Sequence, residues 1–366
     1  MQVSDNIENL KPYVPGKPIE ETKREYGLQK VFKLASNENP LGPSEKVLAA
    51  IQKASLEIHR YPDAGFYDLR QAFAKEFAVE PLEISFGNGS NELIDLLIRL
   101  YCKDGDKILT LQSAFIAYQI SAQAAGVETD FVSLKPETLK IDVEDLIKAW
   151  KPEHKIVFLP NPNNPTGTYL NQKEMEKVIH FFGGRDDVVL VFDEAYVEYA
   201  DAADYVSALR YRAQYENLVV LRTLSKAYGL AGLRVGAVFA DKKVINYLDR
   251  IRNPFNVNSL AQAAALAALG DKDYLAKAVK MNSEGKQYFY KEFESAGISY
   301  WPSQANFVLF DCKTNAAEVV EDLLKKGVIV RPVANYKMPN YIRLSIGTEE
   351  ENQKAIKEIK EILGSK

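Results

Sequence analysis

The chain has 366 residues, of which 46% are hydrophobic and 26% are charged, fractions typical of a globular protein rather than a disordered or coiled-coil one. Its 46 Lys and Arg residues nearly balance 50 Asp and Glu residues, so the net charge of −4 gives no sign of a nucleic-acid-binding protein. At about 150 residues per domain, this length predicts about two domains.

The cysteines, histidines and apolar runs argue against a disulfide-rich protein, a zinc protein and a membrane protein. Two cysteines, Cys102 and Cys312, are too few for a disulfide framework or a four-thiolate zinc site, and the three histidines lack metal-ligand spacing. We therefore expect no metal. No apolar run reaches the ~18–20 residues that cross a bilayer, and the N-terminus lacks a signal-peptide pattern. The expected location is the cytoplasm, with neither membrane nor nucleic acid as a partner.

In chain order, the pattern first predicts an arm and then an α/β domain. The first 35 residues, with closely spaced prolines, are predicted to form the arm. Short runs rich in Val, Ile and Leu then alternate with segments of helical periodicity, which indicates a largely parallel central sheet flanked by helices. The predicted strands are 107–111, 156–160, 188–193, 218–223 and 235–240, and the predicted helices include 142–151 and 172–182.

After about residue 250 the pattern changes to long helices followed by strands, which predicts a smaller α+β domain. Helices are expected at 260–269, 272–296, 315–326 and 349–363, and strands at 307–310, 327–331 and 341–346. We therefore expect an arm with part of the small domain at 1–39, a large α/β domain at 40–250 and a small C-terminal domain at 251–366.

The first chemical motif is the segment 84–100, in which a strand-like start ends at Gly87 and Gly89. Ser90 and Asn91 then open an amphipathic helix. Both residue types favour a helix start, where free backbone N–H groups attract anions. The segment predicts a phosphate site, and an ordinary capped helix is the alternative.

The second motif, NPNNPTG at 161–167, follows the predicted strand 156–160. Its prolines and Gly167 favour a rigid loop at the carboxyl end of a strand, where ligands bind in such sheets. The amide of Asn164 can both donate and accept hydrogen bonds there. A simple turn is the alternative.

The third motif is DEAY, in which Asp193 ends the predicted strand 188–193. A buried carboxylate is costly unless it is paired, so we expect Asp193 to face a cation. Tyr196 follows three residues later and can offer its hydroxyl to the same ligand. An aspartate that caps the next turn is the alternative.

The fourth motif, TLSKAYGLAGLRVG at 223–236, groups Thr223, Ser225, Lys226 and Arg234 with three glycines. A neighbouring guanidinium and partial desolvation both lower the pKa of a lysine, which favours the free amine needed for covalent chemistry. An isolated lysine is usually a solvated surface residue, so the prediction depends on the whole group.

Together, these segments supply the groups needed to bind pyridoxal phosphate. Lys226 is expected to bond to the cofactor through its amine, and Asp193 to pair with the ring nitrogen. Tyr196 and Asn164 are expected to hydrogen-bond the ring 3-oxygen. Contacts to the cofactor phosphate are expected from Ser90, Asn91, Thr223, Ser225 and Arg234, and a contact to the ring face from Phe115.

In their order and sequence, these motifs resemble the fold-type I pyridoxal-phosphate aminotransferases. Segments near both ends are similar to the histidinol-phosphate aminotransferase subfamily: KPYVPGKPIEE (11–21), SNENPLGPS (36–44), RYPD (60–63) and VIVRPVANYKMPNYIRLSIGT (328–348). The chain departs from many relatives at Asn91, where they have Asp, and at Phe115, where they have Tyr.

The resemblance also implies residues that bind substrate. Arg343 would hold the anionic end, and Tyr13 and Arg331 would join it around a phosphate, since a guanidinium suits carboxylate or phosphate. A solvated strand-end charge is the alternative for Arg331. Asn37 is expected to line the same pocket. Tyr61 would reach the cofactor site of a neighbouring subunit, which implies a homodimer.

The implied activity is a reversible transamination between L-histidinol phosphate and 2-oxoglutarate, which gives imidazole-acetol phosphate and glutamate in histidine biosynthesis. Three alternatives remain: an aromatic amino-acid aminotransferase, a pyridoxal-phosphate decarboxylase of a phosphorylated amino acid, and a cofactor-binding regulatory protein. The complete set of Lys226, Asp193 and Tyr196 argues against the last.

Overall fold

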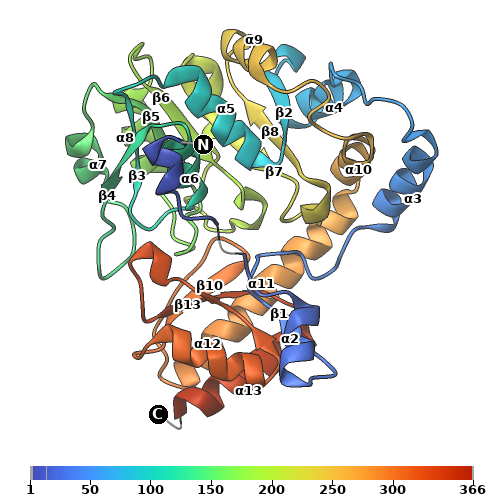
Figure 1. The fold of residues 1–366 in the computed structure, drawn as a ribbon, viewed down its shortest axis with the longest axis vertical. Helices are drawn as coiled ribbons and strands as arrows, with labels where there is room; N and C mark the ends of the chain where they lie inside the picture. Colours follow the sequence, from blue (N-terminus) through green and yellow to red (C-terminus); the bar gives the residue numbers. More distant parts are fainter. Residues whose placement is uncertain (1–2, 14, 365–366) are drawn as a thin grey trace.

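A computed structural model of the chain describes residues 3–13 and 15–364. Its largest sheet consists of β2 (Ile84–Asn88), β3 (Lys107–Leu111), β4 (Glu128–Val132), β5 (His154–Pro160), β6 (Val189–Asp193), β7 (Leu218–Thr223) and β8 (Val235–Phe239). These seven strands are arranged in the order β2-β8-β7-β6-β5-β3-β4 and lie in the upper part of Figure 1.

The strands from β7 through β6, β5 and β3 to β4 run parallel, which confirms the predicted mostly parallel sheet. In contrast, β8 runs antiparallel to both β7 and β2. Parallel neighbours need a long crossover connection, usually a helix. The link between β7 and β8, residues 224–234, holds only a short 3-10 helix (Ala231–Leu233), so the chain turns directly back.

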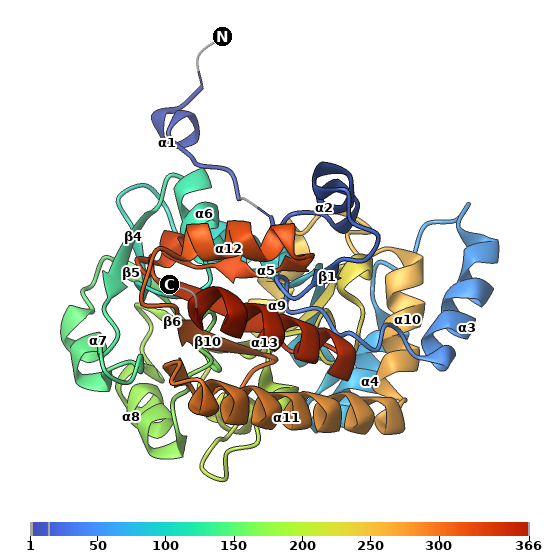
Figure 2. The same ribbon diagram turned by 90° about the horizontal axis from the view of Figure 1, so that it is seen from below.

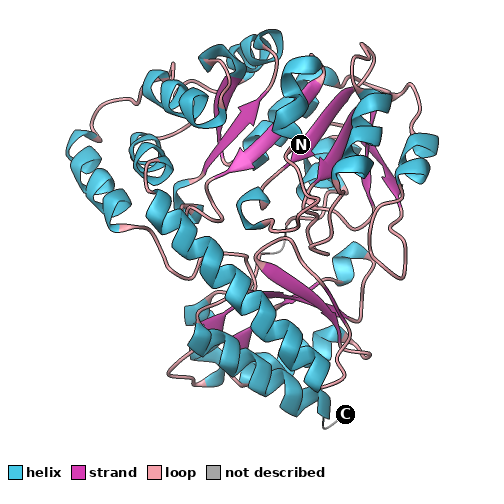
Figure 3. Cartoon of the chain, turned by 180° about the vertical axis from the view of Figure 1, so that it is seen from behind, coloured by secondary structure: helices cyan, strands magenta, loops and turns pink. Residues whose placement is uncertain are grey.

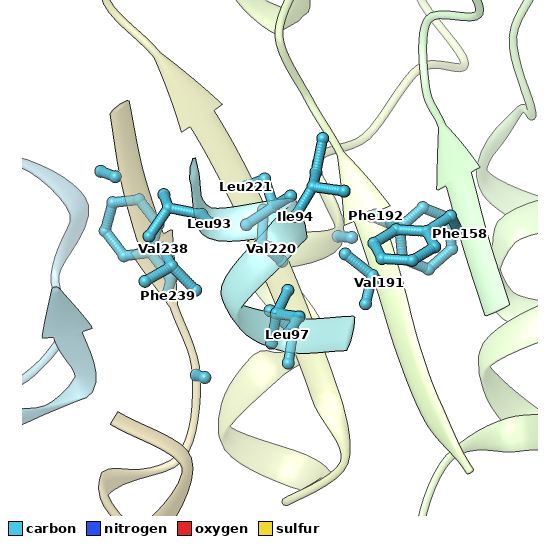
Figure 4. Close-up of a cluster of buried hydrophobic side chains, with 14 of the residues drawn as sticks. Leu93, Ile94, Leu97, Phe158, Val191, Phe192, Val220, Leu221, Val238 and Phe239 are labelled. Atoms are coloured by element: carbon cyan, nitrogen blue, oxygen red, sulfur yellow. The ribbon is translucent and has the colours of Figure 1, made fainter. Parts of the chain in front are cut away.

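Helices flank the large sheet, and α5 (Ser90–Tyr101) shows how they pack. In Figure 4, Leu93, Ile94 and Leu97 project from α5 toward apolar side chains of the sheet. This spacing forms one apolar stripe on a helix, and each fully buried leucine or isoleucine contributes about 1.5–3 kcal/mol. The other helices around this core are α3 (Glu45–Ala54), α4 (Tyr67–Phe77), α6 (Ala117–Ala124), α7 (Val143–Ala149), α8 (Gln172–Phe182), α9 (Lys242–Ile251) and α10 (Ser259–Leu269).

A second, smaller unit has its own sheet and its own hydrophobic core. Its strands are β9 (Tyr300–Trp301), β10 (Phe307–Asp311), β12 (Arg331–Pro332) and β13 (Tyr341–Ser345), and its helices are α11 (Lys272–Ser295), α12 (Ala316–Lys325) and α13 (Glu349–Gly364). The sheet is antiparallel in the order β12-β13-β10-β9. Figure 3 shows the long α11 running from beside the large sheet into this unit.

The N-terminal arm contains α1 (Asp5–Glu8), α2 (Ile19–Tyr26) and β1 (Phe32–Lys33). β1 pairs in parallel with β11 (Val328–Ile329), and Leu34 is buried in the core of the smaller unit. In Figure 2, α2 lies beside the smaller unit. α1 instead contacts α6 of the large unit, where the Asn6 amide donates to the carbonyl of Gln123 at 3.0 Å. The arm therefore contacts the large unit as well as the C-terminal third of the chain, and the exact domain boundaries stay a prediction.

The single strand predicted at 327–331 is wrong. The structure divides this segment into β11, which pairs with β1, and β12, which pairs with β13. Val330 lies between the two strands, at the point where the segment passes from one sheet to the other. Among the described residues, no helix is long and apolar enough to cross a membrane.

Candidate active site

A cavity of about 360 Å³ lies where the carboxyl ends of β5, β6 and β7 face the smaller unit. Its walls come from both units. The cavity brings together nearly all the predicted site residues: Tyr13, Asn37, Ser90, Asn91, Phe115, Asn164, Asp193, Tyr196, Thr223, Ser225, Lys226, Arg234, Arg331 and Arg343.

Lys226 lies in the loop after β7 and reaches the cavity, where its amine donates a long hydrogen bond of 3.4 Å to the carbonyl of Ser36. Enclosure by protein lowers its pKa to about 8, and the positive charge of Arg343 acts in the same direction. At neutral pH the uncharged amine that a nucleophile requires is then a minor form, but a far larger share than at the ordinary lysine pKa of 10.5.

Asp193, the last residue of β6, is buried at the cavity and is held by two donors. The hydroxyl of Tyr118 donates to its carboxylate at 2.7 Å, and the backbone N–H of Ala195 donates at 3.2 Å. Burial raises the pKa of Asp193 to about 6, while the Tyr118 hydrogen bond opposes this rise. Asp193 therefore stays mostly ionised at neutral pH and can pair with a cation in the cavity.

Tyr118 was not predicted as a site residue. It is fully buried on α6, stacks on Phe158 with ring centroids 4.9 Å apart, and meets Phe115 edge-on at 5.8 Å. Phe115 lies two residues before α6 begins, so the two rings meet where the chain enters this helix. The hydrogen bond to Asp193 joins residues 75 positions apart, so no local pattern could reveal it.

The predicted phosphate site is a compact corner at the start of α5. Gly89 has φ +76°, and a Cβ added there would lie 2.3 Å from Nη2 of Arg234. Gly236 is equally constrained, because its Cβ would lie 2.5 Å from the backbone nitrogen of Ser90. Arg234 itself has φ +58°, in the left-handed region that is uncommon for a non-glycine residue.

This corner fits a phosphate group on chemical grounds. Ser225 presents a buried hydroxyl to which no partner is assigned among the described residues. A guanidinium, hydroxyls and a helix N-terminus are the donors that bind phosphate in proteins. The glycines keep these donors close together, so the residues present fit the phosphate of the predicted cofactor.

The smaller unit contributes two arginines that lie directly opposite each other on neighbouring strands, Arg331 on β12 and Arg343 on β13. Arg343 is buried and donates at 2.6 Å both to Oδ1 of Asn164 and to the carbonyl of Ala35. Arg331 lies over the ring of Tyr13 at 5.6 Å. Like charges opposite each other are unfavourable, so this pair indicates a site for an anion.

Tyr196 and Asn37 also meet at the cavity. The side-chain amide of Asn37 donates to the Tyr196 hydroxyl at 3.0 Å, and burial raises the pKa of Tyr196 to about 12. Tyr196 is therefore a neutral hydroxyl at any working pH. The Asn37 amide has protein partners, so a direct contact with substrate stays a prediction.

Tyr61 is the one predicted site residue outside this cavity. It is 81% exposed and stacks on Phe255 with ring centroids 4.5 Å apart. In this position Tyr61 does not line the cavity of its own chain. In the described part of the chain, no cluster of His, Cys, Asp and Glu side chains could hold a metal ion, and the absence of a metal stays a prediction.

The family model described as aminotransferase class I and II matches residues 29–359 of the chain. Two similar relatives are named histidinol-phosphate aminotransferase. That of Bdellovibrio bacteriovorus is 48% identical and covers 99% of this chain and 98% of its own length, and that of an Anaeromyxobacter species is 44% identical with 99% of each covered.

A crystal structure of histidinol-phosphate aminotransferase from Sinorhizobium meliloti in complex with pyridoxal-5′-phosphate has a similar fold. The TM-score is 0.91 at 28% sequence identity, and the match covers 100% of this chain and 98% of that one.

Proposed function

The chain belongs to the class I and II aminotransferases, and from this premise we propose that it transfers the amino group of L-histidinol phosphate to 2-oxoglutarate. The cofactor is pyridoxal 5′-phosphate. One observation carries the choice of substrate: the cavity that holds Lys226 and Asp193 also contains the opposed pair Arg331 and Arg343. Two guanidinium groups match a dianionic phosphate better than a single carboxylate.

When bound, pyridoxal phosphate stabilises the negative charge that develops at the substrate Cα. Lys226 then acts as the base and acid that moves the proton of that carbon, because its amine is uncharged in part near neutral pH. The ionised Asp193 pairs with the ring nitrogen and keeps it protonated. Tyr196 and Asn164 form hydrogen bonds with the ring 3-oxygen.

The remaining residues bind and orient. Ser90, Asn91, Thr223, Ser225 and Arg234 hold the cofactor phosphate, and Phe115 covers the ring face. Phe115 lacks the hydroxyl that many relatives have there, but stacking needs only the ring. Tyr13, Arg331 and Arg343 hold the substrate phosphate and, in the other half-reaction, a carboxylate of 2-oxoglutarate or glutamate, and Asn37 lines the same cavity.

The proposal includes a homodimer in which Tyr61 of each subunit reaches the cofactor site of the other. The exposure of Tyr61 supports this, and so does that of Phe255, whose ring stacks on it. Other large apolar side chains are exposed in the same stretch of the sequence: Leu48, Leu56, Ile58 and Tyr67. Exposed apolar side chains of this kind mark an interaction surface when they adjoin one another. We place the enzyme in the cytoplasm because both cysteines remain thiols, as in reducing compartments.

Two tests address the cofactor chemistry and the substrate. Borohydride reduction of the holoenzyme followed by peptide mapping should find the cofactor on Lys226, and labelling elsewhere would contradict its role. Steady-state kinetics with 2-oxoglutarate should give a kcat/KM for L-histidinol phosphate at least about tenfold above that for phenylalanine or tyrosine.

The kinetic test also separates the alternatives. A preference for phenylalanine would make the protein an aromatic amino-acid aminotransferase. Release of carbon dioxide from a phosphorylated amino acid, tested separately because histidinol phosphate has no carboxyl group, without any need for 2-oxoglutarate would make it a decarboxylase. The variant Arg331→Met should reduce kcat/KM more for histidinol phosphate than for phenylalanine, and an equal reduction for both would remove Arg331 from phosphate binding.

A further inference from the structure

Three buried side chains form a chain of hydrogen bonds that ends at the Tyr196 hydroxyl. The backbone N–H of Asn37 donates to Oγ of Ser345 at 2.9 Å. The Ser345 hydroxyl donates to Oδ1 of Asn37 at 2.8 Å. The Nδ2 group of Asn37 then donates to the Tyr196 hydroxyl at 3.0 Å. The chain links β13 of the smaller unit to the loop after β6.

The direction of these bonds follows from the number of hydrogens available. A backbone N–H can only donate, so Ser345 accepts from it and keeps its own hydrogen for another acceptor. With the Asn37 amide in its present orientation, that acceptor is Oδ1. If the amide were turned over, the Ser345 hydrogen would have no assigned acceptor among the described residues, which is costly in a buried place.

The consequence concerns the single hydrogen of the Tyr196 hydroxyl. Because the oxygen already accepts from Asn37, the hydrogen is not needed for that contact. Within the described part of the chain, no protein acceptor is assigned to it, and Tyr196 lines the cavity. The hydrogen is therefore free to point toward a bound ligand.

We propose that Ser345 and Asn37 are positioning residues that aim the Tyr196 hydroxyl hydrogen into the cavity, toward the 3-oxygen of the bound cofactor. This inference deepens the proposed function and depends on it. Neither residue needs to touch the reacting atoms, because each acts through Tyr196.

Two further contacts hold the backbone at Asn37 and Ser345 and touch neither the Asn37 amide nor the Ser345 hydroxyl. Its φ of +54° lies in the left-handed region, which asparagine tolerates better than most residues. Asn306 donates to its carbonyl at 3.0 Å, and Ser345 is held by a backbone hydrogen bond to the carbonyl of Leu34 at 2.9 Å. The orientation of Tyr196 thus depends on how the arm and the smaller unit pack on the large one.

Removal of the Ser345 hydroxyl should release the Asn37 amide. Its two orientations then become similar in energy, and in the reversed one Oδ1 accepts the Tyr196 hydrogen and withdraws it from the cavity. A donated hydrogen bond stabilises a deprotonated oxygen. Its loss should therefore let the protonated form of the bound cofactor persist to higher pH.

The experiment compares the variants Ser345→Ala and Tyr196→Phe, and the double variant, as cofactor-loaded enzymes. The readouts are the pH midpoint of the visible absorbance change and the Kd of pyridoxal phosphate for each apoprotein. Tyr196→Phe should move the midpoint upward, by about one pH unit, and weaken binding about tenfold. Ser345→Ala should produce a smaller shift in the same direction and none in the Tyr196→Phe background.

Asn306→Ala is the matched control, because it removes a buried hydrogen bond to Asn37 without changing the direction of the others. It should leave the midpoint in place. Three results would overturn the inference. The first is a Ser345→Ala shift that persists in the Tyr196→Phe background, and the second is an equal shift in Asn306→Ala. The third is no shift in Ser345→Ala while Tyr196→Phe shifts the midpoint. If the unmodified protein binds no pyridoxal phosphate, the proposed function itself fails, a result distinct from these.

Discussion

Buried charged residues at the ends of β6 and β7 lie in two neighbouring regions. One region lines the cavity, and the other lies behind it. Asp193 and Thr223 line the cavity. Their sequence neighbours, Glu194 and Arg222, lie behind it and form an ion pair at 2.9 Å. Glu194 also accepts hydrogen bonds from Ser207 Oγ and the Ala208 backbone, and a second carboxylate, Glu198, lies 3.5 Å from Arg222.

Both regions contain a carboxyl group with a raised pKa. Burial raises the pKa of Asp193 to about 6 and that of Glu198 to about 7. Behind the cavity, however, Arg222 pairs with both carboxylates, whereas Asp193 is held by neutral donors and is left to pair with a ligand. A shifted pKa therefore does not by itself identify a functional residue. What distinguishes Asp193 from Glu198 is that Asp193 lines the cavity.

The strongest test of this comparison replaces the two neighbouring carboxylates in turn. Asp193→Asn should lower kcat by about 10³-fold, because the ring nitrogen loses its charged partner. Glu194→Gln should change kcat by only a few fold, since Glu194 faces away from the cavity. Steady-state kinetics of both holoenzymes measure the contrast, and similar losses in the two variants would contradict it.

Arg222→Met should have its main effect on stability. The substitution leaves two buried carboxylates without their cation, and the loss of one partner of such a group costs about 4 kcal/mol. Urea denaturation should show the lower free energy of unfolding. The folded holoenzyme should keep its visible absorbance, and loss of that absorbance without loss of stability would assign Arg222 to the cofactor site instead.

Glu198 should make stability depend on pH. Its pKa rises from an ordinary 4.5 to about 7 on folding, so the folded state binds more protons between these values. Stability from this group is therefore greatest below pH 4.5 and falls as the pH rises to about 7. Relative to the parent protein, the Glu198→Gln variant should gain up to about 3 kcal/mol in free energy of unfolding as the pH rises from 4.5 to about 7. Denaturation of both proteins at several pH values measures the difference in free energy of unfolding between them. A difference that stays constant with pH would show that Glu198 does not titrate in this range.

The smallest expected effect is that of Tyr118→Phe. The variant keeps the ring that stacks on Phe158 and removes only the hydroxyl that donates to Asp193. The pKa of Asp193 should rise, and the cofactor should bind about tenfold more weakly. The acid limb of the pH–rate profile should move to higher pH, and an unchanged profile would show that Ala195 alone holds the carboxylate.

Much of the large sheet could be predicted from local pattern. The strands predicted at 107–111 and 218–223 have the bounds of β3 and β7, and the helix predicted at 172–182 has those of α8. Buried strands and amphipathic helices are encoded by which nearby side chains are apolar, so a short window is sufficient. The division of 327–331 and the reversed direction of β8 depend on pairing partners outside such a window.

The sequence by itself determined the candidate groups: Asp193 ends a predicted strand, and Lys226, Tyr196 and Asn164 each lie just beyond one, at the edge where ligands bind. The tertiary structure decided how these groups are held. Tyr118 reaches Asp193 across 75 positions, and Ser345 reaches Asn37 across 308. The strand pairing of β12 and β13 puts Arg331 opposite Arg343. Such contacts arise when distant segments pack together, because hydrogen-bond direction and charge pairing depend on three-dimensional neighbours rather than on spacing along the chain.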